Sequence, residues 1–170
     1  MHEQYWKMLW EQKHFEQYFW HYNIWNTRRL IYVNALLIAA SIFNLAYALA
    51  IADLNRLGII IHIALAVLCQ TAILCWPLSQ MVERKIALKY FVPELMKHFD
   101  EISVEWISIT NGKYSDDEIE SLIMKYSKKY SELTATYAPD YPISRESEEF
   151  AEAQCKNYFK YHFDSQECAE

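Results

Sequence analysis

The chain has 170 residues with only two glycines and four prolines, a composition that favours long helices over a turn-rich β architecture. Its formal net charge is −6, with the acidic excess in residues 83–170, so we do not expect direct binding to nucleic acid. No glycine-rich phosphate-binding motif, metalloprotease motif or nucleophile elbow occurs. We therefore expect no catalytic residue, no cofactor and no enzyme activity.

The first predicted element is a helix over residues 1–29 with an unusual load of aromatic side chains. Helix-favouring Glu, Gln, Lys and Met fill the gaps, and neither proline nor glycine interrupts it. The aromatic residues do not keep to one stripe, which indicates apolar contacts on more than one side. We interpret the segment as a cytoplasmic or interfacial anchor, with an assembly surface between protomers as the alternative.

Residues 30–82 predict a transmembrane helical hairpin. Its two stretches, 30–52 and 57–82, contain no Asp, Glu, Lys or Arg. Each exceeds the roughly 20 residues that a helix needs to cross a hydrocarbon core of about 30 Å. The connecting segment, residues 53–56, is so short that the two helices must be antiparallel neighbours. A pair of buried helices in a soluble bundle is the alternative.

Aromatic and basic residues flank this hairpin on the side of both termini. Basic residues hold flanking segments in the cytoplasm during insertion, so we expect both termini to be cytoplasmic. The residues predicted to lie at the membrane interface are Trp25, Arg28, Arg29, Trp76, Arg84 and Lys85.

Both predicted spans carry a polar stripe. Asn34, Ser41 and Asn44 share an arc of about 80° on the first span, and His62 and Gln70 share a similar arc on the second. Polar groups in hydrocarbon need a partner or water. These residues therefore either contact one another inside one hairpin or line a hydrophilic path between several hairpins. Small residues in the first span favour close helix association, and hence a homo-oligomer.

Two prolines are expected to disturb the helices around residue 83. Pro77 is expected to kink the second span near the cytoplasmic interface. The amphipathic pattern then continues out of the membrane and is expected to be interrupted at Pro93. The Asn111-Gly112 pair predicts a turn after it.

Residues 83–170 are predicted to form a cytoplasmic helical region that packs as a small bundle, on itself or against other copies. Ser115 with Glu118 forms a capping box that predicts the start of one helix, and the proline-containing segment 138–142 ends it. A last helix is predicted from about Ser144 to about Phe163.

Histidine and cysteine spacings do not favour a metal site. His14 and His21 are seven residues apart, as are Cys155 and His162, whereas metal-ligand pairs on helices usually sit three or four apart. We predict no metal, and no disulfide framework among the four cysteines.

The order of these features resembles a known family. An aromatic helix with Trp25, Arg28 and Arg29 precedes a tight two-span hairpin, and the helical tail ends in the amphipathic stretch 149–159. This order is similar to that of the SLATT class of bacterial two-transmembrane effectors. The resemblance implies an anti-phage, abortive-infection system that breaches the inner membrane, with a separate sensor or inhibitory partner.

We therefore expect a multi-pass protein of the inner membrane that contacts lipid, oligomerises and permeabilises the membrane. The alternative is a non-conducting anchor or adaptor whose cytoplasmic helices recruit a soluble partner. A third hypothesis, a small membrane enzyme or metal transporter, would require His62 to gather with His14 or His21.

Overall fold

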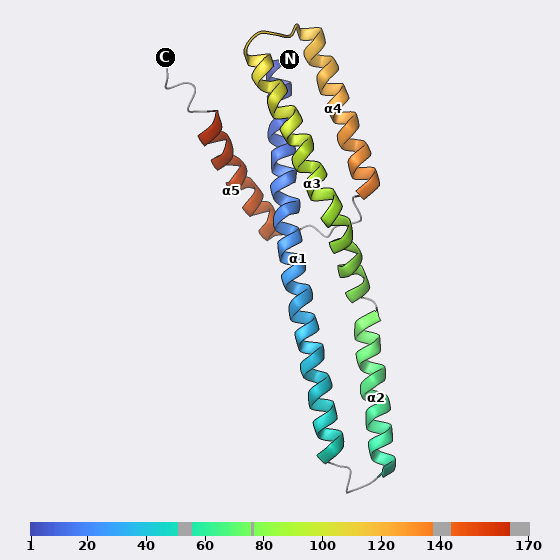
Figure 1. The fold of residues 1–170 in the computed structure, drawn as a ribbon. Helices are drawn as coiled ribbons and strands as arrows, with labels where there is room; N and C mark the ends of the chain where they lie inside the picture. Colours follow the sequence, from blue (N-terminus) through green and yellow to red (C-terminus); the bar gives the residue numbers. More distant parts are fainter. Residues whose placement is uncertain (51–55, 76, 138–143, 164–170) are drawn as a thin grey trace. The chain divides into compact units, whose positions relative to one another are not determined.

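A computed structural model describes residues 1–50, 56–75, 77–137 and 144–163, and these residues form helices without any strand. The predicted all-α class is thus confirmed for the described part of the chain. The helices are α1 (His2–Ala50), α2 (Arg56–Cys75), α3 (Pro77–Thr110), α4 (Asp116–Tyr137) and α5 (Arg145–His162) (Figure 1).

The chain divides into two compact units, to which both α1 and α3 contribute. We call residues 1–24 with 86–170 the bundle unit, and residues 25–85 the paired-helix unit. The first 24 residues thus belong to the same compact unit as the C-terminal half of the chain.

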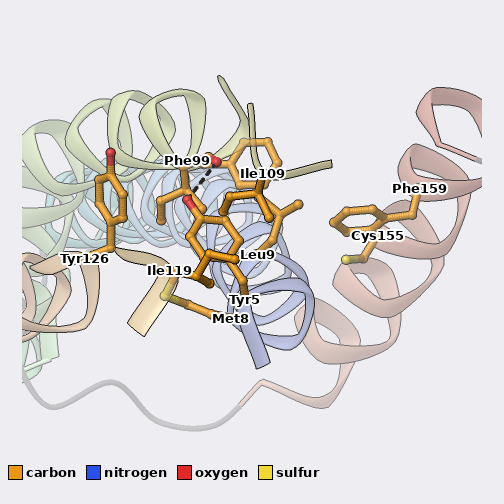
Figure 2. Close-up of a cluster of buried hydrophobic side chains, with 10 residues drawn as sticks. Tyr5, Met8, Leu9, Phe99, Ile109, Ile119, Tyr126, Cys155 and Phe159 are labelled. Carbon is orange, nitrogen blue, oxygen red and sulfur yellow. Dashed lines mark hydrogen bonds between the residues drawn. The ribbon is translucent and has the colours of Figure 1, made fainter. Parts of the chain in front are cut away.

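The bundle unit has a hydrophobic core to which four helices contribute (Figure 2). Within it, the buried Tyr5 donates a hydrogen bond from its hydroxyl to the carbonyl of Ile102, at 3.1 Å. This bond satisfies the one polar atom that Tyr5 brings into an apolar environment. The core residues are Tyr5, Met8 and Leu9 of α1, Phe99, Ile102 and Ile109 of α3, Ile119 and Tyr126 of α4, and Cys155 and Phe159 of α5.

Several aromatic side chains near the N-terminus pack inside this bundle. Trp6 lies 5.1 Å from Trp106 and 4.9 Å from Phe159, measured between ring centroids. Phe19 lies 4.9 Å from Phe91 in an edge-to-face arrangement. These rings of α1 are thus covered by side chains of α3 and α5.

The predicted starts of α4 and α5 are confirmed, whereas the proline-containing segment 138–142 that was expected to end α4 lies outside the described residues. The Glu118 carboxylate accepts a 2.8 Å hydrogen bond from the backbone amide of Ser115, and the hydroxyl of Ser115 accepts one of 3.4 Å from the amide of Glu118. This is the reciprocal capping box, and it opens α4. Gly112 in the preceding turn has a φ of 69°, a conformation that glycine adopts without steric cost.

Both expectations for the prolines need correction. α3 continues through Pro93 to Thr110, because Leu88, Phe91 and Leu95 around it are buried in the bundle and their packing outweighs one missing helix hydrogen bond. Pro77 is the first residue of α3, a position where a helix amide has no partner within the helix anyway. The predicted span 57–82 covers nearly all of α2 and the first six residues of α3, and residue 76 between them lies outside the described residues.

The start of α5 provides a stability prediction. Ser144 is the N-cap of α5, and its hydroxyl accepts a 3.3 Å hydrogen bond from the amide of Ser147. We expect Ser144→Ala to lower the free energy of unfolding by about 1 kcal/mol, because the first turn loses this acceptor. Denaturant unfolding followed by circular dichroism measures it. Ser131→Ala is the control, since that exposed hydroxyl bonds only the carbonyl of Ser127 in its own helix. Equal losses in both variants would contradict the capping role.

The paired-helix unit exposes long apolar side chains. An 18-residue window of α1 has a mean hydropathy of 1.8 and is only 6% buried, so α1 is long and apolar enough to span a membrane and does not resemble a buried core helix. Among the helical segments that are described, α1 alone meets these criteria. Its strongly exposed residues include Ile31, Tyr32, Leu36, Ile38, Ile42, Phe43, Leu45 and Leu49.

Candidate functional site

A small cavity lies between α1 and α2 in the paired-helix unit. It has a volume of about 170 Å³, and three of the polar residues predicted from the sequence line it: Ser41 and Asn44 from α1, and His62 from α2. Ala48 and Ala66 also line it, and their short side chains leave the space open. The structure thus brings these three residues together within one pair of helices.

His62 contributes an imidazole side chain to the lining of this cavity. Its ring lies 4.7 Å from the ring of Tyr47, at an angle of 55°. The Nε2 atom of His62 is buried and makes no hydrogen bond within the described part of the chain. An unsatisfied buried nitrogen is costly in an apolar environment. The rest of the cavity lining is mostly apolar, with Ser41 and Asn44 as the other polar residues.

The other residues of the predicted stripes lie in different environments. The Ser41 hydroxyl donates to the Leu37 carbonyl at 2.8 Å, one turn earlier in its own helix. Asn34 is exposed on α1 and does not line the cavity. Gln70 belongs to α2, but its side chain lies outside the described residues. The predicted arc on α1 is therefore divided, with Asn44 facing α2 and Asn34 facing outwards.

A further polar contact in this unit was not predicted from the sequence. Asn26 is only 1% exposed, and its side-chain amide donates to the backbone carbonyl of Met81 at 3.1 Å. From Asn26 onward, Leu30, Leu37, Asn44 and Ala48 follow one another at spacings of four or seven residues, so Asn26 belongs to the face of α1 that packs inside the unit. That spacing is a signal in the sequence, but the expected boundary at residue 30 separated Asn26 from it.

The residues predicted to lie at the membrane interface are placed as follows. The Arg29 guanidinium lies over the Trp25 ring, 5.2 Å from its centroid. Arg28, Arg29 and Lys85 are exposed, and Arg84 is partly exposed. Trp76 lies outside the described residues.

The histidines weighed as metal ligands contact α5 instead. His14 Nε2 lies 3.5 Å from a carboxylate oxygen of Glu148, and His21 Nδ1 lies 3.0 Å from the Ser147 hydroxyl. His14 and His21 therefore hold α5 against α1. No group of three or more potential metal ligands gathers among the residues that the structure places.

Two buried groups in the bundle unit have unusual electrostatic surroundings. The buried Lys13 ammonium donates to the Glu16 carboxylate at 2.8 Å and lies 4.4 Å from the ring centroids of both Phe99 and Tyr158. Ionic and cation–π contacts together offset the cost of removing this charge from water. Burial raises the pKa of the Cys155 thiol to about 12, so this thiol is protonated at neutral pH.

No family model matches the chain, and comparisons with curated proteins and with solved structures found no match either. The class of the protein therefore rests on its own fold and site. It is an all-α protein in which α1 and α2 line a small, mostly apolar cavity, and the bundle unit packs several of the N-terminal aromatic residues.

Proposed function

We propose that the chain is a two-span protein of the bacterial inner membrane, with residues 30–82 as a transmembrane hairpin and both termini in the cytoplasm. The exposed apolar surface of the paired-helix unit supports this proposal. Leu36 and Phe43 are each 71% exposed and Ile42 is 64% exposed, a pattern that is unfavourable in water and favourable in lipid. Arg28, Arg29 and Lys85, exposed at the cytoplasmic ends, fit the orientation.

Within that membrane, copies of the chain associate and permeabilise the bilayer, as the resemblance to SLATT effectors of abortive infection implies. The observation that carries this step is Asn34, an exposed amide among the long apolar side chains of α1. In lipid it must find a partner on another copy or contact water. Two helices are too few to enclose a hydrophilic path, so several hairpins have to contribute. A separate sensor or inhibitory protein controls their activity.

The test is a flux assay with the purified full-length chain in liposomes, using a voltage-sensitive dye and a potassium gradient. We expect the wild-type chain to dissipate the gradient. A variant with Asn34, Asn44, His62 and Gln70 all changed to Leu should lose at least about tenfold in flux, because the path would lose its hydrogen-bonding groups.

Thr71→Val is the matched control for this variant. Thr71 is an exposed residue of α2 whose hydroxyl donates to the Val67 carbonyl at 2.6 Å, so the change also replaces a polar group by an apolar one. Its flux should equal that of the wild type. Wild-type protein that leaves the gradient intact, both in liposomes and in cells expressing it with its genomic neighbours, would rule out permeation.

The second candidate function is a non-conducting adaptor. The cavity between α1 and α2 favours it, since Ser41, Asn44 and His62 meet inside one helix pair and need no second copy. The variant with all four substitutions would keep the membrane location and the soluble partner of an adaptor. The wild-type chain of an adaptor would itself conduct no ions.

A further inference from the structure

Another cavity lies in the bundle unit, between the last turns of α3 and α5. It has a volume of about 240 Å³. An engineered protein cavity of about 150 Å³ is large enough to hold benzene, so a small organic molecule fits here. Because α3 ends at Thr110 and α5 at His162, the cavity is at the carboxyl end of both helices. Its wall includes Ser103, Trp106, Thr110, Tyr158, His162 and Phe163.

Three aromatic side chains line this cavity. Tyr158 and Phe163 of the α5 end lie 6.3 Å apart between ring centroids, and Trp106 comes from α3. Trp6 of α1 lies 5.1 Å from Trp106 and 5.3 Å from Phe163, so it packs against a ring from each side of the cavity. A cation within about 6 Å of a ring centroid is attracted to the negative face of the ring. The aromatic wall therefore favours a positive ligand.

The hydroxyl groups in the wall offer acceptors to a ligand. Ser103 donates its hydroxyl proton to the backbone carbonyl of Asp100 at 2.9 Å. Thr110 donates to carbonyls of its own preceding turn, at 3.0 and 3.1 Å. A hydroxyl has one proton and two lone pairs, so these bonds leave acceptor capacity on both oxygens. N–H groups of a ligand can donate to them.

The charges around the cavity are negative on balance. The carboxyl end of a helix carries a partial negative charge, and α3 has no basic residue in its last turn to offset it. Burial raises the pKa of the Tyr158 hydroxyl, and the nearby carboxylates of Glu16 and Asp100 raise it further. A field that disfavours a second negative charge on Tyr158 favours a positive ligand beside it.

Positive groups of the protein also approach these rings. The Lys13 ammonium lies 4.4 Å from the centroid of Tyr158, but its charge is paired, because it donates to the Glu16 carboxylate at 2.8 Å. Lys160 and His162 in the last turn of α5 offset part of the dipole of that helix. The negative end of α3 is left for a ligand.

We propose that this cavity binds a small organic cation that carries N–H donors, namely a protonated amine or an alkylguanidinium. The rings attract its positive charge, and the Ser103 and Thr110 oxygens accept hydrogen bonds from its N–H groups. An anion would meet aromatic faces and a helix carboxyl end, both of which disfavour it. The inference concerns the bundle unit alone, so it depends neither on permeation nor on a membrane location.

The test is a ligand-detected NMR titration of the full-length chain in non-ionic detergent, at neutral pH and constant ionic strength. The probes are butylammonium, its neutral isostere n-butanol, the anion butyrate, and tetramethylammonium, a cation without N–H groups. Butylammonium should bind with a Kd on the order of 1 mM. It should bind at least about tenfold more tightly than n-butanol or butyrate, and about threefold more tightly than tetramethylammonium. Equal binding of n-butanol or butyrate would overturn the proposal, and equal binding of tetramethylammonium would overturn the role of the N–H donors.

Substitutions at Thr110 test the location. Thr110 is exposed, and a lysine there suits the last turn of a helix. Thr110→Lys places an ammonium of the protein at the cavity and should weaken butylammonium binding at least about tenfold, because like charges repel. Thr110→Val removes only the acceptor oxygen and should weaken binding about threefold.

The same two changes at Thr136 are the matched controls. Thr136 is an exposed residue in the last turn of α4, and its hydroxyl donates to the carbonyl of Glu132 at 2.7 Å. Thr136→Lys and Thr136→Val should bind butylammonium like the wild type, and circular dichroism should show full helicity for all four variants. Thr110 variants that are folded and bind butylammonium as tightly as the wild type would show that this cavity is not the site.

Discussion

Phe99→Ala is expected to lower the free energy of unfolding of the bundle unit by about 3–5 kcal/mol. Phe99 is 1% exposed, lies 5.6 Å edge-to-face from the Tyr158 ring and carries the Lys13 ammonium over its own ring. The substitution leaves a cavity and also removes half of the aromatic surroundings of a buried charge. Since domains are typically stable by about 5–15 kcal/mol, the loss is a large part of the total.

The measurement is denaturant unfolding of the full chain in detergent, followed by circular dichroism and tryptophan fluorescence. Met124→Ala is the control, because Met124 is 62% exposed on α4 and should change stability by less than about 0.5 kcal/mol. If both variants unfolded at the same denaturant concentration, Phe99 would not be part of a packed core.

His98→Leu is expected to stabilise the bundle unit at neutral pH and to flatten its dependence on pH. His98 is 1% exposed, and neither ring nitrogen makes a hydrogen bond of good geometry within the described residues, although the Tyr126 backbone lies close enough to favour the protonated ring slightly. Leucine removes two unsatisfied buried groups at similar volume, a gain of about 1–3 kcal/mol. Burial, and then the nearby Lys129 charge, lower the pKa of His98 in the folded chain.

The direction of the pH effect follows from that lowered pKa. When the pH falls below the ordinary histidine pKa of 6.5, the unfolded chain binds a proton at His98 before the folded chain does. Stability is therefore fully present above about pH 6.5 and declines as the pH falls towards the lower folded pKa. The substitution leaves the charged neighbours Lys129 and Glu101 and the rings of Tyr126 and Tyr130 unchanged. A difference in pH dependence between wild type and variant therefore comes from His98.

His98→Gln separates the effect of imidazole titration from the cost of burying a polar side chain without hydrogen bonds. Glutamine does not titrate, so this variant should lose the decline between pH 7.5 and pH 5, but it should not gain the stability of the leucine variant, because its amide is also buried. Unfolding midpoints at several pH values measure both. A His98→Leu protein whose stability falls with pH as steeply as that of the wild type would show that other groups cause the decline.

The features predicted correctly from the sequence depend on neighbouring residues. Ser115 with Glu118, Gly112 and Ser144 each act within a few positions of the chain, so their residue types alone indicate a helix start or a turn. Pro93 shows the limit of this local reasoning. A proline predicts a break, but burial of the residues on both sides of it is decided by helices that are distant in sequence.

The N-terminal aromatic residues could not be assigned for the same reason. Trp6 contacts both α3 and α5, and Phe15 stacks on Tyr130 of α4, so the apolar side chains of α1 point in several directions and form no single stripe. Sequence reasoning reached the same limit at the candidate site. Helical spacing placed Asn44 and His62 on polar arcs, but only the packing of α1 against α2 shows that they share a cavity from which Asn34 is absent.

The high pKa of Cys155 gives the bundle unit a built-in reporter. The Cys155 sulfur lies 3.6 Å from the carbonyl oxygen of Trp10. Because burial raises the pKa of this thiol, almost no Cys155 side chain is in the reactive thiolate form at neutral pH. An alkylating reagent can modify this position only while α5 is detached from α1. The rate of labelling at Cys155, read by peptide mass spectrometry, therefore counts openings of the last helix in the unmodified protein, without any introduced probe.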